Sequence, residues 1–222
     1  MKNIITYSDP KSVISEEFRA IRTSIQYSNL DNKIKTILVT STTKNEGKTT
    51  TISNLAVSFA KLDNKKVLLI DCDLRNPSVH KAFGISNIKG LSDLLIEGKS
   101  ILNYINSTQV ENLHIITAGA VPPNPAEVLA SDTMKEFIKN IQNEYDYVFI
   151  DTPPIGMVTD AGILASFIDG TVLVVRYEMV DINKIKESKK KLNAVNANIL
   201  GAILNRRKVS NDDYYYSYYG SK

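Results

Sequence analysis

Short apolar runs alternate with longer stretches of mixed polarity along most of the chain. Six runs rich in β-branched residues predict strands, at Thr36–Thr40, Val67–Asp71, Leu113–Ala118, Tyr147–Asp151, Thr171–Arg176 and Ile199–Asn205. Nearly all-apolar runs are typical of strands covered on both faces. Helical spacing of apolar residues is clearest at Thr49–Leu62, Pro125–Asn143 and Ile182–Val195. This alternation predicts a doubly wound α/β fold, with a mostly parallel sheet and helices on both faces.

The two ends of the chain differ from its middle. Residues 1–33 form a polar arm with one helical stretch, and residues 208–222 are polar and tyrosine-rich with no apolar period. We therefore expect an N-terminal arm at 1–33, one domain at 34–207 and a flexible tail at 208–222. In the arm, helical spacing relates four charged residues: Glu16, Glu17, Arg19 and Arg22. From spacing alone, they form a solvated face with ion pairs worth tenths of a kcal/mol each.

Composition narrows the class of protein. The chain has 222 residues, 43% hydrophobic and 23% charged, which suits one globular α/β domain. Its net charge of +3 gives no argument for nucleic acid. No apolar run approaches the ~20 residues of a membrane span, and the N-terminus lacks the apolar core of a signal peptide. Cys72 is the single cysteine, so no intrachain disulfide can form and a reducing cytoplasm fits.

A phosphate-binding loop is predicted between the first strand and the helix that follows it. The segment 41–50 reads STTKNEGKTT, and Gly-Lys-Thr at such a turn is the core of a P-loop, or Walker A motif. Backbone N–H groups at the helix N-terminus would face phosphate oxygens, Lys48 would contact the β- and γ-phosphates, and the Thr49 hydroxyl would ligate Mg²⁺. The nucleotide-binding candidates in this loop are Asn45, Glu46, Gly47, Lys48, Thr49 and Thr50. The first glycine of the usual motif is replaced by Thr42.

Two aspartate motifs strengthen the prediction of a P-loop NTPase fold that binds Mg-ATP. The second strand ends in Asp71-Cys72-Asp73-Leu74-Arg75, and the fourth ends in Asp151-Thr152-Pro153-Pro154. Carboxylates at the carboxyl ends of such strands lie where ligands bind in open α/β sheets. We expect Asp151 and Asp73 to complete the Mg²⁺ shell and Asp71 to accept a proton from an attacking hydroxyl. Arg75 would either sense phosphate or pair with an aspartate.

The tail carries five clustered tyrosines: Tyr214, Tyr215, Tyr216, Tyr218 and Tyr219. Such a run could also form a stacking platform for nucleic acid. A platform of that kind needs basic neighbours, whereas Asp212 and Asp213 precede this run. We therefore interpret the tyrosines as phosphate acceptors and expect no nucleic-acid partner.

Together these motifs resemble the bacterial tyrosine kinases of capsular and exopolysaccharide synthesis, in their stand-alone cytoplasmic form. Further matches lie at residues 16–23 (EEFRAIRT), 90–95 (GLSDLL) and 122–129 (PPNPAEVL), so the resemblance covers nearly the whole chain. It implies ATP-dependent tyrosine phosphorylation, autophosphorylation of the tail and a role in polysaccharide synthesis and export. It also implies a homo-oligomeric ring, a membrane adaptor that recruits and activates the kinase at the inner face of the plasma membrane, and a tyrosine phosphatase partner. In such a ring, the alternative role of Glu16, Glu17, Arg19 and Arg22 is a contact between subunits. In similar proteins an asparagine at the place of Asn205 contacts adenine; a simple turn residue is the other interpretation.

Two other functions are open to a chain of this pattern. One is an ATPase switch of the partition or cell-division type, and the other is a non-enzymatic, ATP-dependent scaffold of the polysaccharide machinery. Partition ATPases carry a signature lysine five residues before the P-loop lysine, where this chain has Thr43 with Lys44 next to it. That difference and the tyrosine run favour the kinase.

Overall fold

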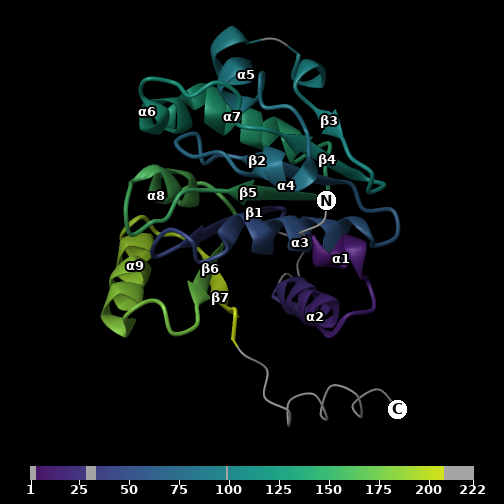
Figure 1. Cartoon of the computed structure of the whole chain (residues 1–222). Coiled ribbons are helices and arrows are strands. Elements are labelled where there is room, and N and C mark those ends of the chain that lie inside the picture. The colour runs from purple at the N-terminus through teal and green to yellow at the C-terminus, as the bar shows by residue number, and fades with distance from the viewer. Residues whose placement is uncertain (1–3, 29–33, 99, 208–222) are drawn as a thin grey trace.

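The computed structural model describes residues 4–28, 34–98 and 100–207, and it contains one seven-stranded sheet (Figure 1). The strands are β1 (Thr36–Ser41), β2 (Val67–Asp71), β3 (Asn106–Ser107), β4 (Leu113–Ile116), β5 (Tyr147–Asp151), β6 (Gly170–Arg176) and β7 (Ile199–Asn205). Their order is β3-β4-β2-β5-β1-β6-β7, and every pair is parallel except β3 with β4. The predicted α/β class is confirmed, and the carboxyl ends of the parallel strands meet at one edge.

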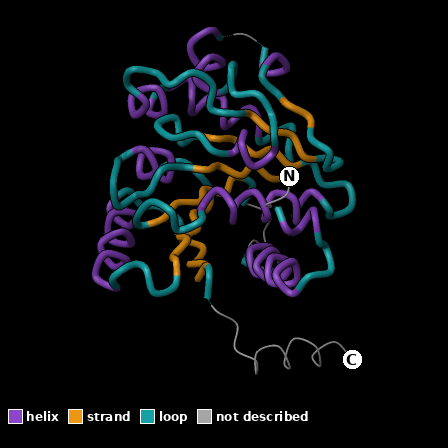
Figure 2. Tube along the Cα trace, viewed as in Figure 1, coloured by secondary structure: helices purple, strands orange, loops and turns teal. Residues whose placement is uncertain are grey.

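Helices cover both faces of the sheet (Figure 2). They are α1 (Ile5–Ser8), α2 (Val13–Tyr27), α3 (Lys48–Ala60), α4 (Val79–Phe83), α5 (Leu91–Glu97), α6 (Pro125–Ala130), α7 (Asp132–Ile141), α8 (Asp160–Ala165) and α9 (Ile182–Ala194), with a 3₁₀ turn at Ile101–Asn103. One apolar cluster joins the sheet to α3 and α4, and a second joins it to α5, α7, α8 and α9.

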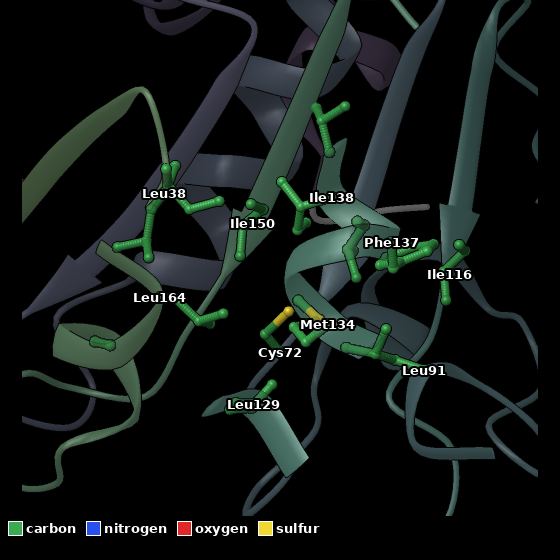
Figure 3. Close-up of a cluster of buried hydrophobic side chains, with 14 of the residues drawn as sticks. Leu38, Cys72, Leu91, Ile116, Leu129, Met134, Phe137, Ile138, Ile150 and Leu164 are labelled. Carbon is green, nitrogen blue, oxygen red and sulfur yellow. The ribbon is translucent and has the colours of Figure 1, made fainter. Parts of the chain in front are cut away.

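The central strands supply alternate side chains to these two clusters. In β1, Ile37 and Val39 belong to the cluster beside α3, whereas Leu38 belongs to the other (Figure 3). All three side chains are fully buried, because helices pack on both faces. Cys72 lies in the same cluster as Leu38 and is a buried core residue. The continuous apolar runs of the sequence thus reflect two buried faces.

Two expectations about the elements were wrong in detail. The helix expected at Pro125–Asn143 is two helices, because Ser131 adopts an extended backbone and its side chain caps α7 by accepting the Met134 N–H. Strand β3 was not expected. It consists of two polar residues that pair with Ile115 and His114 of β4.

The N-terminal segment packs on α3. In α1, the Thr6 backbone N–H and hydroxyl both donate to Asn54 Oδ1 at 3.0 Å. In α2, Arg22 donates to the Ser58 carbonyl at 2.6 Å, and Ile25 is buried in the cluster beside α3. The segment expected to be a polar arm with one helix therefore forms two helices that share the domain core.

Over the described ranges, no helix combines the length and apolar character that crossing a membrane requires. The expected phosphate acceptors Tyr214, Tyr215, Tyr216, Tyr218 and Tyr219 lie outside the residues that the structure describes.

Candidate nucleotide site

The turn from β1 to α3 presents a row of backbone N–H groups. No N–H group of residues 44–50 donates to any described residue of the protein, and the first bond into α3 is from the Thr51 N–H to the Gly47 carbonyl. Asn45 and Gly47 adopt left-handed backbone conformations, with φ of 64° and 92°. Successive N–H groups in such a turn form a concavity that binds anions. The expected phosphate loop is therefore present as geometry, with Asn45, Gly47, Lys48, Thr49 and Thr50 around it.

Thr49 and Asp151 form a pair at the base of this loop. The Thr49 hydroxyl donates to Asp151 Oδ2 at 2.6 Å and lies 2.8 Å from the Ser78 hydroxyl. The other oxygen, Asp151 Oδ1, is buried and has no hydrogen-bond partner among the described residues. A hydroxyl beside an unpartnered carboxylate oxygen is a donor set that suits Mg²⁺, which keeps several waters and takes few protein ligands. The residues present therefore fit the ion.

Lys48 and Asp73 lie on the same side of the loop as this pair. Lys48 is mostly buried, and its positive charge acts to lower the pKa of both Asp73 and Asp151. Burial outweighs that effect: it raises the pKa of Asp73 and brings the pKa of Asp151 to about 6. Asp73 Oδ1 also accepts the Asn76 N–H at 3.0 Å. A cation and two carboxylates thus converge beside the loop, as expected for phosphate and metal binding.

Asp71 has a different environment. Its side chain is fully buried, and its two oxygens accept the backbone N–H groups of Asp73, Ser78 and Val79 at 3.0–3.2 Å. Burial, followed by the charge of Asp151, raises the pKa of Asp71 to about 8. The carboxylate therefore organises the turn after β2. Proton transfer from a bound hydroxyl to Asp71 would require the segment 73–78 to move.

Arg75 pairs with an aspartate that sequence spacing did not suggest. Its guanidinium makes two bonds to the fully buried Asp160, Nε to Oδ2 at 2.8 Å and Nη2 to Oδ1 at 3.0 Å. Of the two roles expected for Arg75, the structure contains the ion pair. The same side chain also lines the cleft described next.

A cleft of about 690 Å³ adjoins the phosphate loop. Its walls include residues that the sequence analysis did not select: Lys44, Asn76, Ser78, Pro153, Pro154, Met157, Val158, Arg176 and Arg206. The sequence feature that these residues share, and that could have identified them, is their position at or after the carboxyl end of a strand. Asn205, expected to contact adenine, donates to the Glu46 carbonyl at 2.8 Å, and its Oδ1 has no partner among the described residues. Asn205 itself does not line the cleft, so its contact with adenine remains a prediction.

The charged residues expected at a subunit contact are partly engaged within the chain. Arg19 forms an ion pair with Glu16 one turn away and also donates to the Pro10 carbonyl. Arg22 is committed to Ser58 of α3. Glu17 is exposed. The i,i+3 ion pair is therefore present, and a contact between subunits remains a prediction.

Comparison with known proteins identifies the family. The AAA domain family model matches residues 34–204. The sequence is 42% identical to the tyrosine-protein kinase YwqD of Bacillus subtilis (strain 168) over 221 residues, all of this chain and 92% of that protein. The chain belongs to the bacterial tyrosine-protein kinases. The family and enzyme class expected from the sequence are thereby confirmed.

Solved structures agree with this kinase membership. The crystal structure of the chimerical protein CapA2B2 matches with a TM-score of 0.89 and 36% identity, over 94% of this chain and 92% of that one. The septum site-determining protein MinD of Pyrococcus horikoshii OT3, complexed with Mg-ADP, matches less closely, with a TM-score of 0.66 and 29% identity over 81% of this chain and 73% of that one. The fold is thus shared with P-loop nucleotide-binding proteins. The structure is more similar to CapA2B2 than to MinD.

Proposed function

We propose that the chain transfers the γ-phosphoryl group of Mg-ATP to tyrosine hydroxyls, among them those of its own C-terminal cluster. The observation that carries this proposal is the row of N–H groups at residues 44–50 beside Lys48 and the Thr49–Asp151 pair. That arrangement suits a polyphosphate with its cation. Tyrosine as the acceptor is supported by the family and by the cluster at Tyr214–Tyr219.

Each group at the loop has a distinct part in the proposed transfer. The N–H groups and Lys48 hold the β- and γ-phosphates, and Thr49, Asp151 and Asp73 hold Mg²⁺. Bound Mg²⁺ supplies positive charge that neutralises the phosphate oxygens. Because the transition state of phosphoryl transfer is loose, positioning and charge neutralisation supply most of the acceleration. Asp71 is the proposed proton acceptor for the tyrosine hydroxyl, whose ordinary pKa is about 10, and its contribution is the smaller one.

The proposal extends to assembly and location. Phosphorylation adds roughly −1.5 to −2 charges per tyrosine, so a tail carrying several would be repelled by its neighbours and by Asp212 and Asp213. We therefore propose a cytoplasmic ring of subunits that loosens as the tail is phosphorylated, with contacts through Glu16, Glu17, Arg19 and Arg22. The proposed partners are the cytoplasmic segment of a membrane adaptor and a tyrosine phosphatase, and the proposed process is capsular or exopolysaccharide synthesis and export.

One assay separates this function from its two rivals. The purified chain is incubated with γ-labelled ATP, alone and with an adaptor fragment, and the labelled residues are mapped. Label on Tyr214–Tyr219 that disappears in Lys48→Met supports the kinase. ATP hydrolysis without phosphotyrosine supports an ATPase switch, and neither activity supports a scaffold.

A further inference from the structure

Glu46 places a negative charge inside the loop that is proposed to bind polyphosphate. It directly precedes Gly47 and Lys48, and its side chain is fully buried. A carboxylate that faced the bound phosphates would repel them. The direction in which Glu46 points is therefore decisive for the loop.

The Glu46 carboxylate is turned into the protein, where it joins the loop to strand β6. Oε1 accepts the Thr43 N–H at 2.5 Å and the Thr43 hydroxyl at 3.2 Å. Oε2 accepts the N–H of Arg176, the last residue of β6, at 3.0 Å. Hydrogen bonds from N–H groups to a carboxylate are roughly twice as strong as those between neutral groups. One side chain thus fixes the start of the loop to the edge of the sheet.

A second bond fixes the same peptide from the neighbouring strand. The Asn205 side chain donates to the Glu46 carbonyl at 2.8 Å, and Asn205 pairs with Arg176 in the β6–β7 register. The contact is close: a Cβ added to Gly47 would lie 2.2 Å from Asn205 Nδ2. The side chain and the backbone carbonyl of Glu46 are therefore both held by hydrogen bonds from the β6–β7 pair.

We propose that Glu46 is a positioning residue for phosphate binding. By engaging the Thr43 and Arg176 N–H groups, its carboxylate fixes the loop in the conformation that leaves the N–H groups of residues 44–50 open to phosphate. The carboxylate points away from the proposed phosphate position and accepts hydrogen bonds from the backbone. This inference rests on the proposed nucleotide binding at the loop.

Glu46→Gln tests the proposal because two backbone N–H groups donate to different oxygens of the carboxylate. A glutamine amide has one acceptor oxygen, so one of the two N–H groups would face the NH₂ group instead. We expect the dissociation constant for Mg-ATP, measured with a fluorescent ATP analogue, to rise about tenfold, the size expected for a lost hydrogen bond to a charged group. The KM for ATP should rise with it, while kcat at saturating ATP is retained. Glu187→Gln, which removes the same charge from the exposed side of α9, should change neither.

The sign of the effect distinguishes positioning from simple charge. If Glu46 acted mainly by repelling phosphate, Glu46→Gln would tighten nucleotide binding, and that result would overturn the proposal. Unchanged affinity would overturn it as well. Loss of kcat with an unchanged KM would also contradict it, since it would assign Glu46 to the chemical step.

Hydrogen exchange of the unsubstituted chain keeps the test independent of whether a variant folds. In the nucleotide-free protein, we expect slow exchange at the Thr43 and Arg176 N–H groups and fast exchange at residues 44–50, which become protected on adding Mg-ADP. Exchange at Thr43 as fast as at residues 44–50 would show that the carboxylate does not hold the loop. If Thr43 is protected but Mg-ADP leaves residues 44–50 unprotected, the nucleotide site fails while the position of Glu46 stands.

Discussion

The turns that follow β1 and β2 both lie at the carboxyl edge of the sheet, yet their backbone N–H groups differ in whether they have hydrogen-bond partners within the chain. After β1, the N–H groups of residues 44–50 have no partner among the described residues. After β2, the N–H groups of Asp73, Asn76, Ser78 and Val79 donate to the carboxylates of Asp71 and Asp73. The second turn is held by carboxyl oxygens that the chain itself supplies. The first turn leaves the same kind of donor available to an anion from outside.

This difference shows how one fold can keep the N–H groups of a binding loop available to a ligand. Unsatisfied N–H groups are costly when buried, so a loop that carries many of them must be exposed or held by other contacts. Here Glu46 and Asn205 hold the loop from the β6–β7 side. The predictions below change one turn or the other, beginning with the largest expected effect.

Removing the cation of the first turn should abolish transfer. Because Lys48 supplies the side-chain charge nearest the proposed phosphates, Lys48→Met should reduce tyrosine phosphorylation by about 10²–10³-fold, the loss typical of one group that stabilises transition-state charge. Phosphotyrosine formation from labelled ATP measures this. Lys81→Met, at an exposed lysine of α4, serves as the control. Activity of Lys48→Met within a few-fold of the unsubstituted chain would contradict the assigned phosphate site.

Replacing the carboxyl group that holds the second turn should destabilise the fold. Asp71→Asn presents an NH₂ group to backbone donors, so we expect the free energy of unfolding of the nucleotide-free protein to fall by about 2 kcal/mol. Denaturant titration measures it, with the exposed Asp63→Asn as the control. An unchanged midpoint would mean that the Asp71 carboxylate does not hold the turn.

The pH dependence of that difference has a definite sign. The pKa of Asp71 is raised from 3.8 to about 8 by burial, so the folded state binds its proton more tightly than the unfolded state. The stability that Asp71 contributes is therefore present at low pH and lost as the pH rises from about 4 to about 8. The stability difference between the unsubstituted chain and Asp71→Asn should narrow over this window. A difference that widens with pH would contradict the direction of the shift.

Metal dependence should respond to the Thr49–Asp151 pair. Asp151→Asn keeps the shape but removes charge beside the proposed Mg²⁺, so we expect the Mg²⁺ concentration for half-maximal activity to rise about tenfold, within the range for weakened metal shells. A Mg²⁺ titration at fixed ATP measures it. Activity that falls equally at all Mg²⁺ concentrations would assign Asp151 another role.

The smallest effect is expected far from both turns. Glu16→Gln removes an exposed i,i+3 ion pair, which should change the stability of the single chain by only a few tenths of a kcal/mol. Sedimentation at matched concentration then tests the proposed subunit contact, since a ring that uses Glu16 should dissociate more readily in the variant. Identical sedimentation and identical stability would show that Glu16 is a solvated surface residue with no part in a subunit contact.

The sequence predicted the six parallel strands well because each is an apolar run, although only the inner strands are buried on both faces and β7, at the edge of the sheet, is partly exposed. It predicted the meeting of Lys48, Asp73 and Asp151 because the carboxyl ends of parallel strands share one edge. Strand β3 could not be predicted in this way, since Asn106 and Ser107 carry no apolar signal and are ordered by pairing with β4. The break at Ser131 lies inside a continuous apolar period, although a serine before an aspartate is a helix start that could have been recognised.

The contacts that the sequence did not reveal are those made with partners distant along the chain. Arg75 and Asp160 are 85 positions apart, and no spacing rule relates them. Glu46 accepts an N–H from Arg176, and a backbone donor is present at every residue except proline, so the sequence contains no mark of it. Residue types near the loop could be predicted, but the direction of each side chain depends on the packed sheet.

The central claim is that a polyphosphate binds where β1 turns into α3. A crystal structure of the chain with Mg-ADP tests it most directly. We predict that the β-phosphate accepts hydrogen bonds from N–H groups of residues 44–50 and from Lys48, with Mg²⁺ beside the Thr49 hydroxyl. A nucleotide whose phosphates lie elsewhere, with no ligand at this turn, would contradict the account.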